Sequence, residues 1–190
     1  MKKEIRVLGI DDGPFSFDQE KVVVIGVVMR GSGYIEGILK GEVEVDGDDS
    51  TKVLVDMING SRYHDQVKAT MLDGIALGGF NIVDIRELYR RTKIPVITIT
   101  RDLPDLDKMK ETLQRKFENW EEKWRVIEEN HLLKFETSHS PIYVALAGIQ
   151  EKDAKEIIRI STIRGVIPEP LRVAHLIASG IVKGESHGKA

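Results

Sequence analysis

The sequence predicts a mixed α/β fold (α+β mixed sheet), in which a five-stranded sheet carries flanking helices and is followed by a hairpin and two more helices. Three strand-like segments joined by short turns open the chain, and this order is typical of an antiparallel meander. Strand-like and helical segments then alternate, with connections long enough for a crossover between parallel strands. A sheet with both kinds of pairing follows from these two observations.

The first three strands are predicted from residue type and spacing. Residues 6–11 alternate weakly and end at the turn Asp12-Gly13-Pro14. Residues 21–29 form a nearly continuous run of β-branched side chains, which favours a strand over a helix. After the break at Gly31-Ser32-Gly33, residues 34–45 complete the meander with a less regular apolar spacing.

The middle of the chain predicts two parallel strands joined by a helix. A first helix precedes them, with an N-cap region at residues 48–51 and apolar residues on one face at 53–58. The two strands are predicted at 67–72 and 95–100, and the helix between them at 82–91. Together with the meander, this order is the ribonuclease H-like arrangement.

The clearest helical pattern covers residues 105–129. Its apolar and aromatic residues step by three and four, which favours a buried helix face over an aromatic box that stacks bases. These residues are Met109, Leu113, Phe117, Trp120, Trp124 and Ile127. The remaining elements are a hairpin at 132–135 and 142–146, and two helices at 151–163 and 169–181.

Composition is that of a globular protein and narrows the possible chemistry. Of the 190 residues, 41% are hydrophobic and 31% are charged, which excludes a disordered chain. There is no cysteine, so disulfides, thiolate catalysis and cysteine zinc sites are excluded. The net charge of −3 differs from the basic character of proteins that coat nucleic acid, so a polyanion would have to meet a local basic patch or a bound metal.

The length predicts one domain, which we place at residues 1–183. We expect the tail at 184–190 to be mobile and its His187 to be exposed. No apolar run approaches 18 residues, and the first residues do not resemble a signal segment. We therefore expect a cytoplasmic protein with no membrane partner. The sequence leaves the oligomeric state open.

Acidic side chains stand at the ends of separate predicted elements. Asp11 ends the first strand and Asp73 ends the fourth, so neighbouring parallel strands would bring both to one edge of the sheet. Asp12 points to the opposite face, whereas Asp49, at the start of the first helix, could reach the same point. Three such carboxylates would hold Mg²⁺ or Mn²⁺ and support phosphodiester hydrolysis. The alternative is that these residues form ordinary Asp-Gly turns and a helix cap.

Two further segments carry polar residues near this edge or in the loops. Residues 78–81 follow Asp73, and their backbone N–H groups could hold a phosphate with Asn81 as an additional donor; alternatively, the glycines only permit a tight turn. His64 lies in the loop before the fourth strand, where a packing role is favoured over catalysis.

Several segments resemble endonuclease V, a nuclease with the ribonuclease H-like fold that cuts near deaminated bases. They occur in the same order over almost the whole chain. They are Gly9 to Asp11, Tyr34 to Leu39, Met71 to Gly74, Pro95 to Arg101 and Pro168 to His175. Residues 11–15 and 79–84 resemble more closely an uncharacterised archaeal family of endonuclease V relatives.

The resemblance implies roles for individual residues. Asp11 and Asp73 match two catalytic metal ligands, and the third carboxylate falls at Asp49, with Glu42 as a competing candidate. Arg101 takes the place of a lysine and keeps a positive charge that can meet a phosphate. The other substrate-binding candidates are Tyr34, from the segment that carries the strand-separating wedge, Gly74 and Asn81.

The chain departs from endonuclease V at three places. Leu77 to Asn81 replace a His-Pro-Arg stretch that takes part in reading the substrate. Ile149 stands where a Gly-His pair supplies a catalytic histidine, and Gly33 and Glu36 replace the prolines of the wedge. Specificity for deaminated bases therefore does not follow from the resemblance.

These observations support three hypotheses. The first is a divalent-metal-dependent nuclease that cleaves phosphodiester bonds in DNA or RNA. The second is a catalytically degenerate ribonuclease H-like module that binds nucleic acid, a nucleotide or a protein partner. The third is hydrolysis of a small phosphoester, with the glycine turn holding the phosphate.

Overall fold

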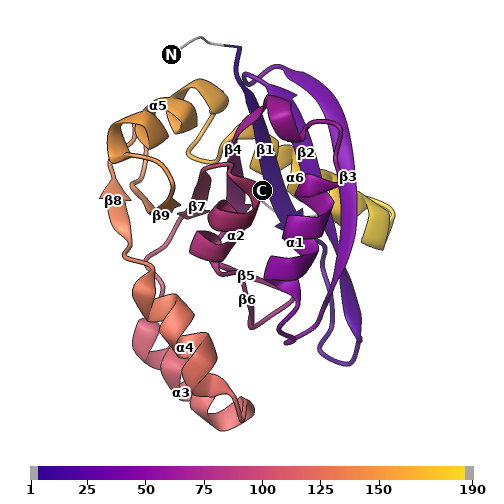
Figure 1. Ribbon diagram of the computed structural model, residues 1–190, viewed down its shortest axis with the longest axis vertical. Coiled ribbons are helices and arrows are strands. Elements are labelled where there is room, and N and C mark those ends of the chain that lie inside the picture. The colour runs from indigo at the N-terminus through magenta and orange to yellow at the C-terminus, as the bar shows by residue number, and fades with distance from the viewer. Residues whose placement is uncertain (1–3, 187–190) are drawn as a thin grey trace.

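The computed structural model describes residues 4–186, which form a mixed sheet with helices on both faces (Figure 1). The strands are β1 (Arg6–Asp12), β2 (Lys21–Arg30), β3 (Tyr34–Glu44), β4 (Val67–Asp73), β5 (Ala76–Leu77), β6 (Asn81–Ile82), β7 (Val96–Thr100), β8 (Leu133–Phe135) and β9 (Ile142–Ala147). The helices are α1 (Ser50–Asn59), α2 (Ile85–Thr92), α3 (Leu106–Lys116), α4 (Trp120–Glu129), α5 (Glu151–Ser161) and α6 (Glu169–Lys183). The sheet runs in the order β3-β2-β1-β4-β7-β9-β8, and β5 pairs with β6 separately.

The opening meander forms as the sequence predicts. β1 and β2 are antiparallel, with Gly9 opposite Val27, and β2 and β3 are antiparallel, with Ile25 opposite Lys40. β2 lies between two other strands, and its β-branched run is largely buried because both of its faces are covered. β3 lies at the edge of the sheet and is much more exposed.

The crossover from β4 through α2 to β7 places three parallel strands side by side. β1 and β4 pair with Ile10 opposite Leu72, and β4 and β7 pair with Asp73 opposite Ile99. Asp84 begins α2, since its side chain accepts hydrogen bonds from two backbone N–H groups of the first turn. The predicted ribonuclease H-like arrangement is confirmed.

The predicted hairpin extends this sheet and does not stand apart from it. β9 is antiparallel to β7, with Thr100 opposite Tyr143, and β8 pairs with the other side of β9. Apolar side chains of β7 and β9 share one buried cluster with α5, which explains why the hairpin docks at this position. The sheet therefore has seven strands, two more than the predicted core.

The single helix predicted at 105–129 is wrong, because the chain forms α3 and α4 there. Phe117 adopts an extended backbone (φ −126°, ψ 130°) between them, and its ring contacts Phe80 edge-on. The predicted apolar face is confirmed, since Leu113 and Ile127 are buried in one cluster with both tryptophans packed against it. The α3–α4 hairpin projects from the body at the lower left of Figure 1.

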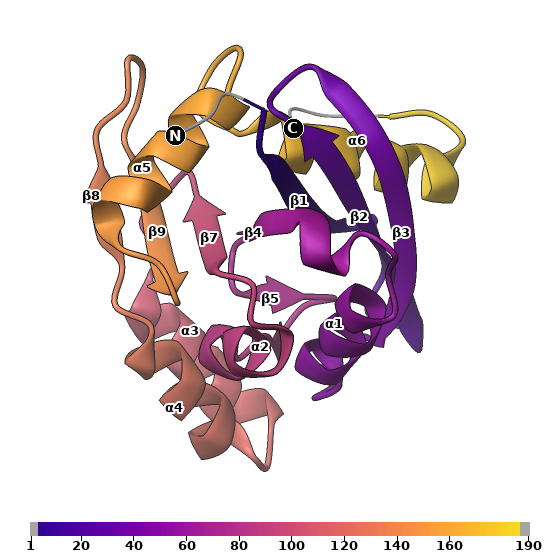
Figure 2. The ribbon, with the colours of Figure 1, turned by 45° about the horizontal axis from the view of Figure 1, so that its top comes forward.

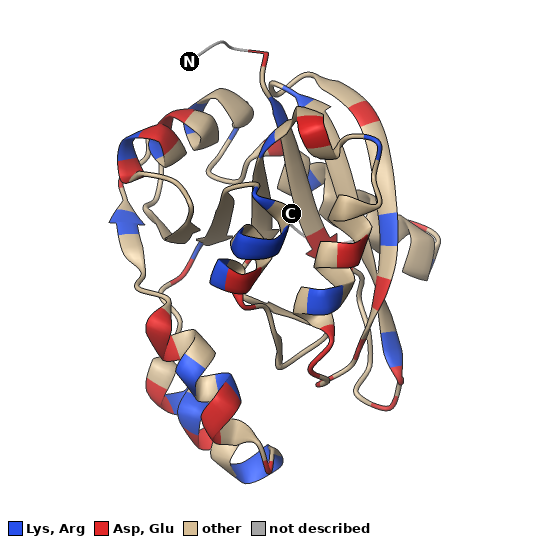
Figure 3. Ribbon diagram, viewed as in Figure 1, with Lys and Arg blue, Asp and Glu red and all other residues tan. Residues whose placement is uncertain are grey.

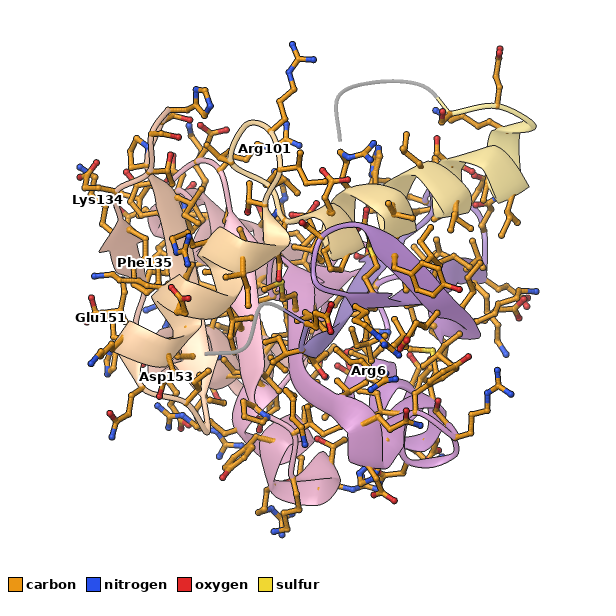
Figure 4. All side chains as sticks on the ribbon, turned by 90° about the horizontal axis from the view of Figure 1, so that it is seen from above. Arg6, Arg101, Lys134, Phe135, Glu151 and Asp153 are labelled. Carbon is orange, nitrogen blue, oxygen red and sulfur yellow. The ribbon has the colours of Figure 1, made fainter. Side chains whose placement is uncertain are left out.

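The other helices form a layer on each face of the sheet (Figure 2). α1 and α2 cover the face toward which Leu8 and Ile10 point, called here the α1 face. α5 and α6 cover the face toward which Val7 and Met71 point, called the α6 face. Phe135 of β8 is buried on that face, with α5 beside it (Figure 4).

A buried lysine attaches α4 to the loops beside the sheet. Lys123 Nζ donates to the carbonyl oxygens of Gly47 and Phe80, at 2.7 and 2.9 Å, and to Asp48 Oδ1 at 2.5 Å. Three acceptors match the three N–H donors of an ammonium group, so the charge is tolerated in a buried position.

The carboxyl-terminal helix α6 extends two residues beyond its predicted end, to Lys183, and Gly184 caps it with φ 82°. Residues 187–190, which include His187 and most of the predicted tail, lie outside the described residues. Within residues 4–186, no helix combines the length and the apolar character that crossing a bilayer requires.

Candidate functional site

The register of the parallel strands brings three charged side chains to one edge of the sheet. Because Ile10 lies opposite Leu72, Asp11 and Asp73 follow side by side, and Asp73 lies opposite Ile99. Side chains alternate along a strand, so Asp11, Asp73 and Arg101 all belong to the α6 face. We call this end of β1, β4 and β7 the carboxyl edge.

Asp11 is the most enclosed of these groups, with 5% of the residue exposed. Its Oδ2 lies 2.9 Å from His175 Nδ1, and its Oδ1 accepts a hydrogen bond of 2.9 Å from the backbone N–H of Asp12. Burial raises the pKa of Asp11 to about 8, and the neighbouring carboxylates of Asp73 and Asp12 act in the same direction. The site therefore concentrates negative charge where solvent is largely excluded.

Gly9 explains how a residue of α6 reaches Asp11. A Cβ atom on Gly9 would lie 2.3 Å from the backbone carbonyl carbon of Pro170, so only glycine lets α6 contact β1 directly. From Gly9 to Asp11 the strand rises about 6.6 Å. From Pro170 to His175 the helix rises about 7.5 Å. The two rises are similar, and His175 is thereby level with Asp11.

Asp73 faces both acidic and basic neighbours. Burial raises the pKa of Asp73, and the nearby charges of Arg101 and His175 lower it. Its side chain remains exposed, so solvent weakens the effect of burial. Asp73 is thus the member of the acidic pair that an incoming ligand meets first.

Asp12 points to the α1 face, as the alternation predicts. Its Oδ2 accepts a hydrogen bond of 2.6 Å from the backbone N–H of Gly78. Burial raises the pKa of Asp12, and the hydrogen bond from Gly78 opposes that shift. Asp12 therefore holds the loop after β5 against the end of β1.

The third predicted carboxylate does not join Asp11 and Asp73. Asp49 Oδ1 accepts hydrogen bonds from Asn81 Nδ2 at 2.6 Å and from the backbone N–H of Glu44 at 3.1 Å. Glu42, the competing candidate, is exposed on the edge strand and pairs with Lys40. In the part of the chain that the structure describes, no three His, Cys, Asp or Glu side chains form a metal-binding group.

Two predicted substrate contacts are also placed away from the acidic pair. Asn81 is fully buried, and its side chain bonds to Glu44 O, Asp49 and the backbone N–H of Ser50, which corrects its expected role as a free donor. Tyr34 starts β3, six residues before Lys40, which the register places level with Asp11. Six residues span about 20 Å, so Tyr34 lies at the other end of the strands, away from the carboxyl edge.

The remaining predictions have mixed outcomes. Gly74, with φ 74°, makes the turn that directly follows Asp73 and needs a glycine for it. Ile149 packs against the core cluster under α5. His64 Nε2 lies 2.8 Å from the carbonyl oxygen of Thr92 and its Nδ1 lies 2.9 Å from Asp65, which confirms the packing role.

His175 ends a segment that resembles endonuclease V, but the sequence alone predicts no role for it. A signal was present, because Glu169, Arg172 and His175 recur every three residues and so share one face of a helix. Glu169 is buried and holds Arg172 through hydrogen bonds of 2.6 to 3.1 Å. The spacing does not predict that α6 contacts β1 at Gly9, which is what brings His175 to Asp11.

A cavity of about 550 Å³ opens beside Gly74 on the α1 face. The sheet supplies Thr98 and Thr100, and the α3–α4 hairpin supplies Met109, Trp124 and Ile127. Trp124 Nε1 is buried and has no hydrogen-bond partner among the described residues. An indole N–H only donates, so this buried donor is unsatisfied within the part of the chain that the structure describes.

Comparisons with known proteins place this chain in a wider group. A family model described as Endonuclease dU matches residues 3–182. The chain is 49% identical to the UPF0215 protein of Methanothermobacter thermautotrophicus over 191 residues, covering 100% of this chain and 94% of that protein. It is 50% identical to the UPF0215 protein of Methanosarcina mazei over 193 residues, covering 100% and 97%.

Solved structures give the same relationship. A protein of unknown function from Archaeoglobus fulgidus superposes with a TM-score of 0.84 at 39% identity, covering 97% of this chain and 100% of that one. Bacillus subtilis endonuclease V has a TM-score of 0.63 at 10% identity, covering 94% and 81%. Ciona intestinalis endonuclease V, solved with a 24mer DNA that contains an inosine, has a TM-score of 0.57 at 16% identity, covering 90% and 83%. The fold is therefore shared with endonuclease V.

Proposed function

The chain belongs to the Endonuclease dU family, whose function is nuclease-related, and from this premise we propose that it is a divalent-metal-dependent nuclease that cleaves DNA near a deoxyuridine. The observation that carries the proposal is the pair Asp11 and Asp73, side by side at the carboxyl edge with His175 and Arg101 around it. The name of the family supports deoxyuridine as the substrate, and DNA bound to Ciona endonuclease V supports a nucleic-acid partner.

The two carboxylates fit Mg²⁺ or Mn²⁺. These cations prefer oxygen ligands, and Mg²⁺ in particular is commonly held by one or two carboxylates, with waters and substrate phosphates completing the shell. Burial first, and then the carboxylates of Asp73 and Asp12, raise the pKa of Asp11, and a bound divalent cation would favour its charged form. When bound by Asp11 and Asp73, the metal would supply a polarised phosphate and a more acidic water.

The protein's own basic groups complete this chemistry. His175 is oriented by its contact with Asp11, so with Nδ1 donating to that carboxylate, Nε2 is free to accept or return a proton. Arg101 lies beyond Asp73 on the same face, and its guanidinium offers the planar donors that match phosphate oxygens. Both residues are thus suited to hold the phosphodiester against the acidic pair.

The cavity beside Gly74 is suited to hold the base. Enzymes that act at single bases commonly turn the base out of the helix and read its edge inside a pocket. Uracil carries a carbonyl oxygen where cytosine carries an amino group, so a hydrogen-bond donor in the cavity wall would favour uracil. Because thymine shares that oxygen, we expect discrimination against thymine to depend on how closely the cavity wall fits C5 of the ring.

Cleavage of labelled DNA tests the proposal. The substrates are matched oligonucleotides with one deoxyuridine, deoxycytidine or thymidine, incubated with Mg²⁺ or Mn²⁺. We expect cleavage of the deoxyuridine strand, and a loss of about 100-fold or more in Asp73→Asn. Asp153→Asn is the control, since Asp153 is an exposed acid of α5 remote from the pair and should retain the activity.

A catalytically inactive binding module is the second candidate, favoured by the absence of a third acidic ligand among residues 4–186. Binding of the same DNA without cleavage under both metals would support it and contradict the nuclease proposal. Titration with Mn²⁺, in the presence and absence of the oligonucleotide, separates the two candidates further. Only the nuclease requires that the wild type bind Mn²⁺ and that Asp73→Asn lose this metal binding.

A further inference from the structure

The loop between β1 and β2 holds an aromatic ring in solvent. The backbone N–H of Gln19 donates to Ser16 O at 3.1 Å, and Gln19 Oε1 accepts from the backbone N–H of Ser16 at 3.2 Å. These bonds close a tight turn in which Phe17 occupies the second position. Phe15 packs against the core cluster and contacts Phe17 edge-on, with 5.4 Å between the ring centres. The exposed ring is therefore fixed by an ordered turn.

The exposure of Phe17 is large for a phenylalanine. The residue is 66% exposed, although an aromatic side chain gains about 1.5–3 kcal/mol when it is buried. Four of the five phenylalanines lie in or beside this region, as Phe15, Phe17, Phe80 and Phe117, and the other three contact neighbouring side chains. Phe17 is thus the exposed ring of this group, whereas Phe15, Phe80 and Phe117 are partly buried.

A cation stands beside the Phe17 ring. Lys116 Nζ, at the end of α3, lies 4.7 Å from the ring centre. Among the described residues this ammonium has no acidic partner or hydrogen bond, whereas many other surface lysines pair with a carboxylate. An aromatic face and an unpaired cation together are the elements that bind single-stranded nucleic acid, by stacking the base and meeting the phosphate.

Phe17 lies close to the carboxyl edge. Asp12 Oδ2 bonds to the N–H of Gly78, and a Cβ on the next residue, Gly79, would lie 3.2 Å from Phe17 Cε1. These contacts add up to a separation on the order of 10 Å between the Asp12 carboxylate and the ring. Phe17 therefore lies on the α1 side of the carboxyl edge, whereas Asp11 and Asp73 lie on its α6 side. A nucleic-acid strand that crosses the end of β1 would reach both.

We infer that Phe17 stacks on an unpaired base next to the cleavage site, with Lys116 contacting the adjoining phosphate. The inference rests on the proposed nuclease function and adds a binding subsite to it. The occupant is a single-stranded segment of the nucleic acid, because a protein partner would require a broader apolar surface than one ring and one cation.

Tyr34 is a matched control for this inference. It is also 66% exposed, but it lies at the opposite edge of the sheet. If exposure alone increased affinity for nucleic acid, both residues would contribute. If the position beside the carboxyl edge matters, only Phe17 will contribute.

The experiment measures binding of a fluorescein-labelled single-stranded 12-nucleotide DNA by anisotropy in the Asp73→Asn background, where the strand stays intact. We expect Phe17→Ala to raise Kd about tenfold or more, and Lys116→Gln to raise it less and to reduce its dependence on salt. Phe17→Trp and Tyr34→Ala should stay within about twofold of the parent. A 2-aminopurine base near the cleavage site should be quenched by the parent and by Phe17→Trp, and not by Phe17→Ala.

The outcomes separate this inference from the proposed function. Cleavage by the wild-type chain together with unchanged binding by Phe17→Ala would overturn the stacking subsite alone. Equal losses in Phe17→Ala and Tyr34→Ala would also overturn it, because the effect would then be general. If the parent bound no nucleic acid under any condition, both the subsite and the nuclease proposal would fail. Thermal unfolding of each variant establishes that the compared proteins are folded.

Discussion

The two ends of the central strands differ in how their acidic residues are balanced, and Figure 3 shows where acidic and basic residues lie along the chain. At the edge where β1 begins, Glu36 of β3 forms ion pairs with both Arg6 and Arg30. The hydrogen bond from Arg6 lowers the pKa of Glu36 below its usual value, with Arg30 acting in the same direction. At the carboxyl edge, burial and two neighbouring carboxylates raise the pKa of Asp11 instead. Glu36 is thus paired with two arginines, whereas Asp11 has other carboxylates as close neighbours.

Under the proposed function, this difference separates an edge that stabilises the fold from an edge that carries the candidate site. An ion cluster with matched charges needs nothing from solution. Crowded acids destabilise the folded chain until a cation or a donor group arrives, and such costs are typical of active sites. Variants at either end of the strands should therefore change stability for different reasons.

The largest effect is expected from Gly9→Ala, which breaks the carboxyl edge. The added methyl group would overlap the backbone of Pro170, so α6 must move away from β1 and carry His175 from Asp11. We expect the free energy of unfolding to fall by about 3 kcal/mol or more. Gly33→Ala is the control, because nothing lies within 4 Å of its Cβ position. Urea unfolding that shows equal stability for both variants would contradict the direct helix–strand contact.

Asp11→Asn should change stability in the opposite direction. It removes a carboxyl group that near neutral pH is charged in the unfolded chain and whose charged form is disfavoured in the folded chain, and it keeps the shape of the side chain. We therefore expect the melting temperature without metal to rise by a few degrees. Under the proposed function, we expect Mn²⁺ to raise the melting temperature of the wild type and not that of this variant. A lower melting temperature in calorimetry would mean that the carboxylate is balanced by its surroundings.

Glu36→Gln tests the opposite edge and should lower the melting temperature. It leaves Arg6 and Arg30 near each other without the carboxylate that joins them. Because the folded-state pKa of Glu36 is lowered, its contribution is present above the unfolded value of about 4.5 and is lost as pH falls below that value. Melting curves should therefore separate wild type and variant at pH 7, and the separation should shrink as pH falls below 4.5 toward the lowered pKa of Glu36. A separation that does not shrink on acidification would exclude the ion cluster as the cause.

The smallest effect is expected at His64, also at the edge where β1 begins. The hydrogen bond to Asp65 raises its pKa, and the Thr92 carbonyl adds to the shift. A raised folded-state pKa stabilises below the unfolded value of about 6.5 and loses this effect as pH rises through the folded value. His64→Gln should therefore lower the melting temperature by about 1–2 °C more at pH 5.5 than at pH 8.5. An equal change at both values would assign the role of His64 to packing alone.

The fold was largely predictable because periodicity records local structure. The spacing of Val and Ile in β2 and the alternation around Asp11 depend only on which side chains are buried. The break at Phe117 was not predictable, since its apolar ring fits both a continuous helix and the contact with Phe80 that ends α3. The docking of β9 against β7 was missed for a similar reason, because a hairpin pattern does not specify its neighbour.

In the candidate site, too, the residues placed by local pattern were predictable and those placed by distant contacts were not. The proximity of Asp11 and Asp73 was predictable, because the sequence pattern indicates both the order of the strands and the alternation of their side chains. Asp49 could not be excluded, because its hydrogen bond to Asn81 joins residues 32 positions apart. Tyr34 belongs to a matching segment, yet a continuous strand carries it to the far edge of the sheet. Contacts between distant elements decide these cases.

The attachment of the α3–α4 hairpin has a consequence for how this protein can diversify. The hairpin connects β7 to β8, whose adjoining ends are separated by one intervening strand, a gap of about 10 Å. A short linker can bridge that gap, and Lys123 provides the main polar attachment of the hairpin to the loops beside the sheet. The hairpin wall of the cavity is thus separate from the strands that carry Asp11 and Asp73. A change in the hairpin would alter the cavity and leave these carboxylates in place.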